Sequence, residues 1–353
     1  MREIVIVMGD LYLEPELTAP PLALPAASAS PGASGAAGVE YIVRFGDRTA
    51  LPEGWRPWVA HWLGLPQYAR EAPASVAAGA LADAPADRAV WMATPVHLIA
   101  GLASVHFDRR SLLRLPDAEL AALAASFRAT FRGSGFDLHP LADGEFLLSG
   151  PPGPAPVTTI EPARMLLTSV AESLPAGDGA PALRRLGAEI EMWLHGHAVN
   201  NERARRGAPP VATLWVWGGA APPVSAPAAS RELLDAAFGS DAYVRGLWRL
   251  AGGETRPMPL DWAAVIGEPR AQRALGVVEV AELLHANASW SLAESVAEID
   301  RRLIAPSLAA LHRGELGRLV VLANDRCLSL RAVNRWRLWR RMRAVRKGVE
   351  ALA

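Results

Sequence analysis

Residues Glu189–Gly219 have the sequence EIEMWLHGHAVNNERARRGAPPVATLWVWGG, which predicts a helix followed by a buried strand, the repeating unit of α/β folds. Gly207 and the pair Pro209–Pro210 are expected to end the helix, because glycine closes helices and proline cannot continue one. Val211–Trp217 is rich in β-branched and aromatic residues, as strands are. The helix is predicted from apolar residues that recur every three or four positions, at Leu183, Leu186, Ile190, Trp193 and Leu194.

The same stretch contains a candidate binding corner. We expect Gly218 and Gly219 to bend the backbone sharply or to let a ligand approach it closely. The two histidines of the stretch, His195 and His197, are two residues apart and would lie about 200° apart on a helix, so they cannot both face one metal ion. The alternative to a binding site is a well-packed structural corner. The candidate ligand-binding residues of this corner are Asn200, Asn201, Arg203, Trp217 and Gly218.

Further strands are predicted on both sides of this stretch. Ile4–Met8 is a short, continuously apolar run, as expected for a strand covered on both faces of a parallel sheet. Arg318–Leu322, which is apolar after its first residue, is predicted to be a further parallel strand. Because ligands of such sheets bind beyond the carboxyl ends of strands, Asp10, Asn324 and Asp325 are candidate site residues. Asp10 fits an alternative role equally well, as a cap of the next turn. Two more elements are predicted, a buried strand at 274–284 and an amphipathic helix at 291–310.

Strands alternate with helices along most of the chain, which predicts an α/β fold with a doubly wound, mostly parallel sheet. Residues 88–156 instead contain several short strands and one helix, and they end at a proline-rich stretch. We therefore predict a core domain formed by 1–87 and 157–331, with 88–156 as a small α+β insert.

The segment 332–353 differs from the rest of the chain. Tryptophans and other apolar residues recur every three positions among many arginines, a pattern typical of a basic amphipathic helix. Such a helix can bind an anionic partner, or it can pack its tryptophans on the core and leave its arginines in water.

Composition excludes several classes of function. The 353 residues contain 36 acidic and 36 basic residues, so the chain as a whole is not an electrostatic nucleic-acid binder. Lys347 is the only lysine, which excludes a P-loop. The single cysteine, Cys327, excludes an intramolecular disulfide and is typical of a reducing compartment. No run of 18 apolar residues predicts a membrane span, and we expect a cytoplasmic protein.

The order of these pieces resembles the archaeal type of cofactor-independent phosphoglycerate mutase, in the alkaline-phosphatase superfamily. The resemblance lies in AHWLGLP at Ala60–Pro66, DRR at Asp108–Arg110, Asn200–Gly219 and Arg318–Asp325. NNERARRG, LWVWGG and ATPVHL are also similar to a bacterial family whose members are described as phosphoglycerate-mutase-like or as regulatory proteins of RpfE type. The resemblance implies an alkaline-phosphatase-like core, two divalent metals held by Asp and His, and a Ser or Thr nucleophile.

The sequence departs from that family where the chemistry takes place. Pro52–Trp55 reads PEGW and contains no hydroxyl at the place of the nucleophile. Asn324-Asp325 stands where the family has Asp-His, and no histidine follows His312. Phosphoryl transfer by the mechanism of that family needs the two metals and also the nucleophile. We therefore predict that the two-metal site is lost, and we expect neither a metal nor a cofactor.

Three functions fit these observations. The first is a regulatory or small-ligand-binding protein, not an enzyme, that binds a phosphorylated or anionic small molecule on a degenerate mutase scaffold. The second is an active mutase or phosphatase with relocated ligands such as Asp10, His285 and Asp325. The third is an adaptor that acts through the basic segment 332–353. The oligomeric state does not follow from the sequence.

Overall fold

The computed structural model describes residues 2–12, 36–101, 104–166, 169–225, 235–268, 272–287 and 289–336. Most of the predicted helix at 332–353 lies outside these ranges. The described chain forms two compact units. Unit 1 comprises 1–59, 233–239 and 256–353, and unit 2 comprises 60–232 and 240–255.

Unit 1 is built on a six-stranded mixed sheet in the order β2-β12-β11-β1-β10-β9. Strands β1, β9, β10 and β11 are parallel, and β12 and β2 add two antiparallel strands at one edge. The strands span Glu3–Gly9 (β1), Asp47–Ala50 (β2), Asp235–Phe238 (β9), Arg273–Glu279 (β10), Arg318–Leu322 (β11) and Arg326–Leu330 (β12). This mixed, mostly parallel sheet with its helices confirms the predicted α/β class.

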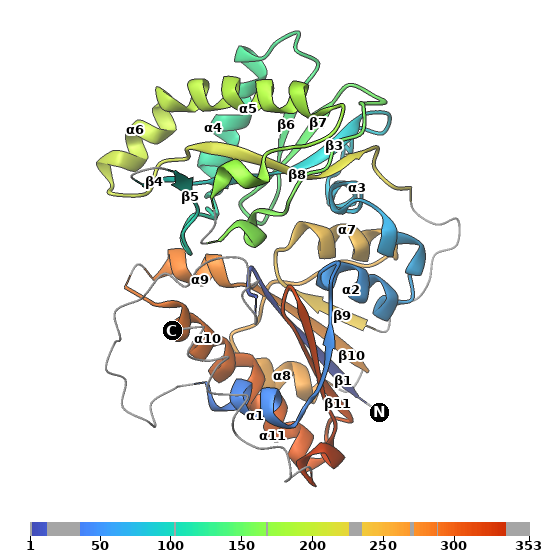
Figure 1. Ribbon diagram of the computed structural model, residues 1–353. Coiled ribbons are helices and arrows are strands. Elements are labelled where there is room, and N and C mark those ends of the chain that lie inside the picture. The colour runs from blue at the N-terminus through green and yellow to red at the C-terminus, as the bar shows by residue number, and fades with distance from the viewer. Residues whose placement is uncertain are drawn as a thin grey trace. The chain divides into compact units, whose positions relative to one another are not determined.

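The helices of unit 1 pack their apolar stripes on one face of this sheet. Ile4, Ile6 and Met8 of β1 form one cluster with buried residues from α1, α8, α10 and α11, which gather beside the sheet in Figure 1. The helices span Ala37–Phe45 (α1), Trp262–Gly267 (α8), Val280–Ala286 (α9), Leu292–Ile299 (α10) and Ala305–Arg313 (α11), with a π-helical turn at Asp300–Ile304 (η5) and a 3₁₀ turn at Ala332–Trp336 (η6). Val5 and Val7, which point to the other face, are fully buried as well, so β1 is covered on both faces as predicted.

Unit 2 contains an antiparallel four-stranded sheet in the order β6-β7-β3-β8, covered by α4 and α5 (Figure 1). Its strands span Ala89–Val96 (β3), Asp137–Pro140 (β6), Phe146–Gly150 (β7) and Thr213–Ala221 (β8), with a separate pair at Ile99–Ala100 (β4) and Val105–His106 (β5). Its helices span Pro73–Ala77 (α3), Asp117–Thr130 (α4), Ala180–His195 (α5), Ala198–Arg205 (α6) and Ala242–Leu250 (α7), with 3₁₀ turns at Pro66–Arg70, Ala78–Ala80, Pro162–Met165 and Val170–Ser173. Helix α2, Trp55–Leu63, crosses the boundary between the units.

The boundaries of the two units differ from those of the predicted domains. The predicted insert, 88–156, supplies β3, β6 and β7, but β8 completes the same sheet by pairing with β3. Strand pairing therefore joins 157–232, which was predicted to belong to the core, to the predicted insert.

Two predicted elements are wrong in detail. The apolar run 274–284 is a strand only to Glu279 and continues as helix α9, because residues such as Ala281 and Leu284 suit a buried helix as well as a strand. The helix predicted to run to Gly207 breaks at Gly196, and α6 starts after His197. His197 caps α6 by accepting a hydrogen bond at Nδ1 from the backbone N–H of Val199.

The predicted strand Val211–Trp217 corresponds to β8, which starts at Thr213 and runs through the Gly218–Gly219 pair. The strand continues to Ala221, and its pairing with β3 shifts register between the partners of Val90 and Met92. The glycines therefore form a β-bulge. A Cβ atom on Gly219 would lie 2.0 Å from the carbonyl oxygen of Val90, which explains the need for glycine there.

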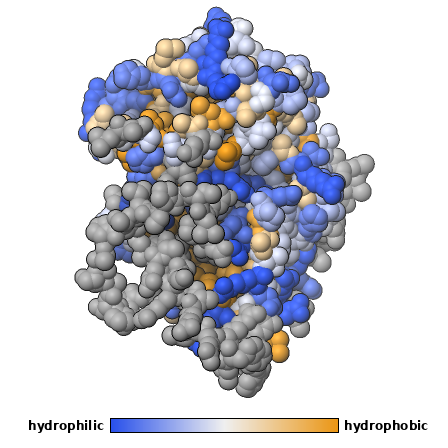
Figure 2. Space-filling view, in the orientation of Figure 1, coloured by the Kyte–Doolittle hydropathy of each residue, from blue (hydrophilic) through white to orange (hydrophobic). Residues whose placement is uncertain are grey.

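Within the described ranges, every helix is too short or too polar to span a lipid bilayer. On the face shown in Figure 2, hydrophobic areas are small and interrupted by hydrophilic side chains.

Candidate functional site

The candidate site lies at the carboxyl edge of the sheet of unit 1, where β1, β10 and β11 end side by side. Glu3–Gly9 is paired with Arg273–Glu279 and, over its first five residues, with Arg318–Leu322. Asp10 follows β1, Glu279 ends β10, and Asn324 and Asp325 follow β11. Three predicted site residues therefore come together at one edge of one sheet.

The chain after β1 is tied directly to the chain after β11. The backbone N–H of Asn324 donates to the carbonyl oxygen of Leu11 over 2.8 Å. Asp10, next to Leu11, has φ 60°, a left-handed conformation that aspartate tolerates better than most residues. Asp10 is therefore the neighbour in sequence of the residue to which the backbone of Asn324 is bonded.

Glu279 is a further candidate site residue, which was not predicted from the sequence. Its side chain is buried and lies over Gly9, where a Cβ atom would come within 2.8 Å of its Oε1. Gly9 thus leaves room for a carboxylate at the strand end. The signal was present in the sequence, as an acid that interrupts the run GVVEVAELL, but the prediction of one long strand concealed it.

Asn324 has the most unusual environment at this edge. Its side chain is 1% exposed, and neither its Nδ2 nor its Oδ1 has a hydrogen-bond partner among the described residues. An unpaired buried amide costs about 1–3 kcal/mol for each lost partner, so native proteins rarely leave one without a reason. A bound molecule that carries both a donor and an acceptor would satisfy it.

The loop after β2 borders the same place. The N–H of Leu51 donates to the carbonyl oxygen of Asp325 over 2.7 Å, and a Cβ atom on Gly54 would lie 3.7 Å from the carbonyl oxygen of Asn324. Pro52–Trp55, which the family resemblance puts in place of the nucleophile, therefore lies beside the end of β11. It contains no hydroxyl or thiol side chain.

The nearby cysteine is a poor substitute nucleophile. Cys327 pairs with Leu322 in the β11–β12 ladder and is buried. Burial raises the pKa of its thiol to about 11, with a smaller opposing effect from the positive charge of Arg318. The reactive thiolate is therefore scarce at neutral pH.

The two metals implied by the resemblance do not fit these residues. A divalent cation needs several oxygen, nitrogen or sulfur ligands, with charge to offset its own. No three His, Cys, Asp or Glu side chains in the described ranges are grouped so that they could hold a metal ion. At the end of β11, where the family has a ligand pair, Asn324 offers a neutral amide. His285, a relocated ligand in the second hypothesis, lies in the last turn of α9.

The other predicted site residues lie in unit 2, where two of them hold the α6 corner together. Asn200 donates from Nδ2 to the carbonyl oxygens of Leu194 and Val211, and its Oδ1 accepts from the N–H of Val211. Arg203 pairs with Glu119 at 2.6 Å and donates to the carbonyl oxygen of Pro209. These bonds occupy the polar groups that a ligand would need.

Asn201, Trp217 and Gly218 also lie in unit 2 but do not share one site. Asn201 is exposed on α6. Trp217 is buried in β8 and donates from Nε1 to Oγ1 of Thr94 over 2.9 Å. Gly218, at φ 61°, donates its N–H to Oγ1 of Thr159. The structure therefore separates the candidates of the α6–β8 corner from Asp10, Asn324 and Asp325.

Trp217 is one end of a buried polar chain in unit 2. Thr94 donates to Glu145 over 3.1 Å, and Glu145 pairs with Arg114 at 2.5 Å. Asp143, two residues away, accepts a hydrogen bond from the N–H of Ala242 at the start of α7. These groups connect the β6–β7 loop to helix α7.

Comparison with known proteins adds little to the α/β class that the topology defines. No protein-family model and no curated protein matches the chain. Among solved structures, it is similar to a cofactor-independent phosphoglycerate mutase from Thermoplasma acidophilum DSM 1728, with 14% identity, a TM-score of 0.36, and coverage of 94% of this chain and 90% of the other. It is also similar to the PH0037 protein from Pyrococcus horikoshii, with 14% identity, a TM-score of 0.45, and coverage of 94% and 87%.

Proposed function

We propose that the chain is a small-ligand-binding protein whose ligand sits at the carboxyl edge of β1, β10 and β11, on a mutase-like scaffold without the two-metal site. The observation that carries the proposal is Asn324, a buried amide with both polar atoms unpartnered at the place where parallel sheets bind ligands. The regulatory role and the cytoplasmic location expected from the sequence stay predictions.

The chemistry of the edge indicates what the ligand carries. One hydroxyl group is both a donor and an acceptor, and an adjacent pair of hydroxyls can satisfy the N–H and the C=O of Asn324 together. The side chains of Asp10, Glu279 and Asp325 are acceptors when ionised, and they oppose an anion at the same spot. A hydroxylated ligand body beside Asn324 is therefore favoured, and a phosphate group of the same ligand is expected to lie farther from these carboxylates.

A thermal-shift screen tests the proposal. The compounds are phosphorylated polyols and hydroxy acids, each paired with its unphosphorylated form, because a ligand that binds only the native state raises the melting temperature by mass action. We expect at least one hydroxylated compound to stabilise the wild-type chain. We expect Asn324→Leu to abolish this shift and Asn201→Ala to retain it.

Metal analysis decides between this proposal and catalysis. The proposal predicts that protein incubated with manganese or zinc and then desalted retains less than one equivalent of metal and does not interconvert phosphoglycerates. Stoichiometric metal together with turnover that Asp10→Ala or Asp325→Ala abolishes would establish the enzyme instead.

A further inference from the structure

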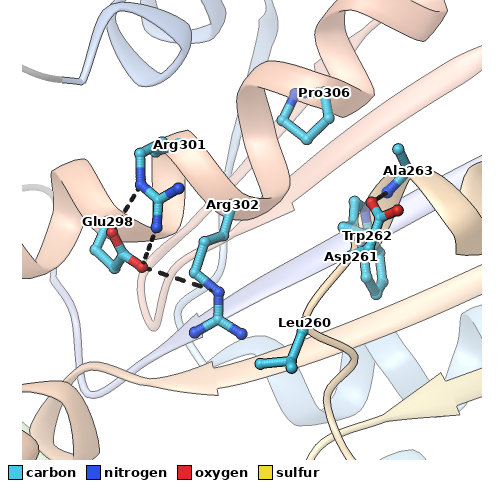
Figure 3. A pocket seen from close by; sticks show the side chains of 8 residues that line it. All are labelled: Leu260, Asp261, Trp262, Ala263, Glu298, Arg301, Arg302 and Pro306. Atoms are coloured by element: carbon cyan, nitrogen blue, oxygen red, sulfur yellow. Dashed lines mark hydrogen bonds and ion pairs between the residues drawn. The ribbon is translucent and has the colours of Figure 1, made fainter.

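A second candidate site lies elsewhere in unit 1, between the start of α8 and the helices α10 and α11 (Figure 3). It is a pocket of about 460 Å³, which is within the usual range for small-molecule sites. No sequence motif indicated it. The lining residues are Leu260, Asp261, Trp262, Ala263, Glu298, Arg301, Arg302 and Pro306.

The π-helical turn η5 explains why two consecutive arginines line this pocket. Asp300, the first residue of the turn, is buried and accepts hydrogen bonds from the N–H groups of Gly38 and Val39 at the start of α1. Leu303 and Ile304 are buried on the same inner side. The turn is thereby fixed, and Arg301 and Arg302 lie outside it. Single π turns within α-helices are frequent at functional sites.

The two arginines differ in how completely their guanidinium groups are paired with hydrogen-bond acceptors. Arg301 donates two hydrogen bonds to the carboxylate of Glu298, from Nε over 2.9 Å and from Nη2 over 2.6 Å. Arg302 reaches the same carboxylate only at 4.0 Å, and its remaining contact is a long hydrogen bond of 3.5 Å to the carbonyl oxygen of Pro259. Among the described residues, nothing else pairs with Arg302. Its planar donor fork is thus largely unused.

The pocket also offers an apolar wall beside this fork. Leu260 is 94% exposed, the highest value among the large hydrophobic side chains of the described ranges. In Figure 3, the guanidinium of Arg302 points to the same side of the pocket as Leu260, with Trp262 beside them and Pro306 at the opposite side. An apolar group bound against Leu260 would remove it from water.

The charges favour an anion with a single negative charge. Arg301 and Arg302 are offset by Glu298 and by Asp261, whose carboxylate caps α8 by accepting from the N–H of Ala263. The four charged side chains of the lining therefore sum to zero. A dianion would be repelled by the carboxylates of Glu298 and Asp261 more strongly than a monoanion would. A carboxylate matches the guanidinium fork with two parallel hydrogen bonds.

We propose that this pocket binds a small monocarboxylate, with its carboxylate on the guanidinium of Arg302 and its apolar group against Leu260. The ligand differs in kind from the hydroxylated ligand proposed for the sheet edge. The two sites are therefore tested separately.

Calorimetric titration with phenylacetate tests this pocket. We expect saturable binding with a dissociation constant of about 1 mM or below, as is usual for a ligand of this size. Phenylacetamide, which has the same shape without the charge, should bind at least about tenfold more weakly, and phenyl phosphate should not bind more tightly than phenylacetate.

Variants locate the binding. Arg302→Gln should weaken binding of phenylacetate at least about tenfold, and Leu260→Ser about threefold or more. Arg313→Gln is the matched control, because Arg313 is exposed on α11, pairs with Glu315 and does not line the pocket, and Asn324→Leu reports on the other site. Neither should weaken binding more than about twofold. A melting temperature close to that of the wild type shows that each variant is folded. Absence of saturable binding, equal binding by Arg302→Gln, or tighter binding of phenyl phosphate would overturn the proposal.

Discussion

At the scale of the residue, burial alone does not separate structural from functional side chains. Asn200 and Asn324 are both buried asparagines. Asn200 makes three hydrogen bonds to the backbone around the α6 corner. Asn324 makes none with its side chain in the described chain. The difference predicts opposite responses to substitution.

Asn324→Leu is expected to stabilise the free protein. Leucine has nearly the shape of asparagine but no polar group to leave unpaired, so the free energy of unfolding should rise by about 1–3 kcal/mol. Urea denaturation without ligand measures it. A loss of stability would mean that the amide is satisfied in the native protein, and it would contradict our account of the site.

Asn200→Ala should have the reverse effect. Removing its side chain leaves the carbonyl oxygens of Leu194 and Val211 unpaired in the interior, which should cost about 2–4 kcal/mol. Asn201→Ala, on the exposed side of the same helix, is the control and should change stability by less than about 0.5 kcal/mol. Equal effects of the two variants in denaturant titrations would show that the corner does not depend on Asn200.

Sequence reasoning identified these asparagines but could not rank them. Both were candidate ligand-binding residues because they are polar and because Asn324 follows a strand and Asn200 lies near the end of a predicted helix. What distinguishes them is the bonding of their side chains. That of Asn200 bonds to Leu194 and Val211, whereas that of Asn324 has no partner among the described residues, and only the tertiary fold reveals this difference.

At the scale of the element, the sequence predicts the strongly periodic or continuously apolar segments well. Arg318–Leu322 is found with the predicted bounds, and Ile4–Met8 lies within β1. The run 274–284 was predicted wrongly because an apolar run does not reveal where a strand becomes a helix. The strand predicted to end at Trp217 continues through Gly218–Gly219 to Ala221, because glycine in a strand marks a bulge as readily as an end.

Helix α7 provides an element-scale prediction about packing. A Cβ atom on Gly246 would lie 2.0 Å from the carbonyl oxygen of Val76 in α3, so Gly246→Ala must push the helices apart. We expect it to destabilise the protein by about 3 kcal/mol or more. Gly187→Ala in α5, where nothing lies within 4 Å, is the matched control and should stabilise by about 0.5–1 kcal/mol. Thermal unfolding of both variants tests the packing.

The link between the β6–β7 loop and α7 predicts a pH dependence of stability. Burial raises the pKa of Asp143 to about 8, and the negative charges of Glu145 and Asp241 raise it further against the opposing effect of Arg114. The folded pKa is above that of the unfolded chain. The contribution of this group is therefore fully present below about pH 4 and is lost as the pH rises through about 8.

Asp143→Asn tests this dependence, since asparagine can still accept the hydrogen bond from Ala242. The melting temperature of the variant should fall less than that of the wild type between pH 5 and pH 9. Asp178→Asn, at an exposed position, is the control and should follow the wild type. Parallel profiles for wild type and Asp143→Asn would rule out Asp143 as the titrating group.

At the scale of the whole molecule, the two units divide the proposed roles. Both proposed ligand sites lie in unit 1, at the carboxyl edge of its sheet and beside η5. Unit 2 contains the α6–β8 corner. The sequence pattern of this corner had made it the strongest candidate for a binding site. The predicted boundaries differ because pairing of β8 with β3 joins segments more than 100 residues apart, and a sequence pattern does not report such pairing.

The central claim is that a small molecule binds at Asn324, and the side-chain amide resonance of that residue tests it most directly. The resonance is assigned by its absence from the nitrogen–proton correlation spectrum of Asn324→Leu. On titration with a compound that stabilises the protein in the thermal-shift screen, we predict a saturable shift of this signal, with the dissociation constant given by calorimetry. Stabilisation by the compound with no change in the Asn324 amide signal would contradict the account.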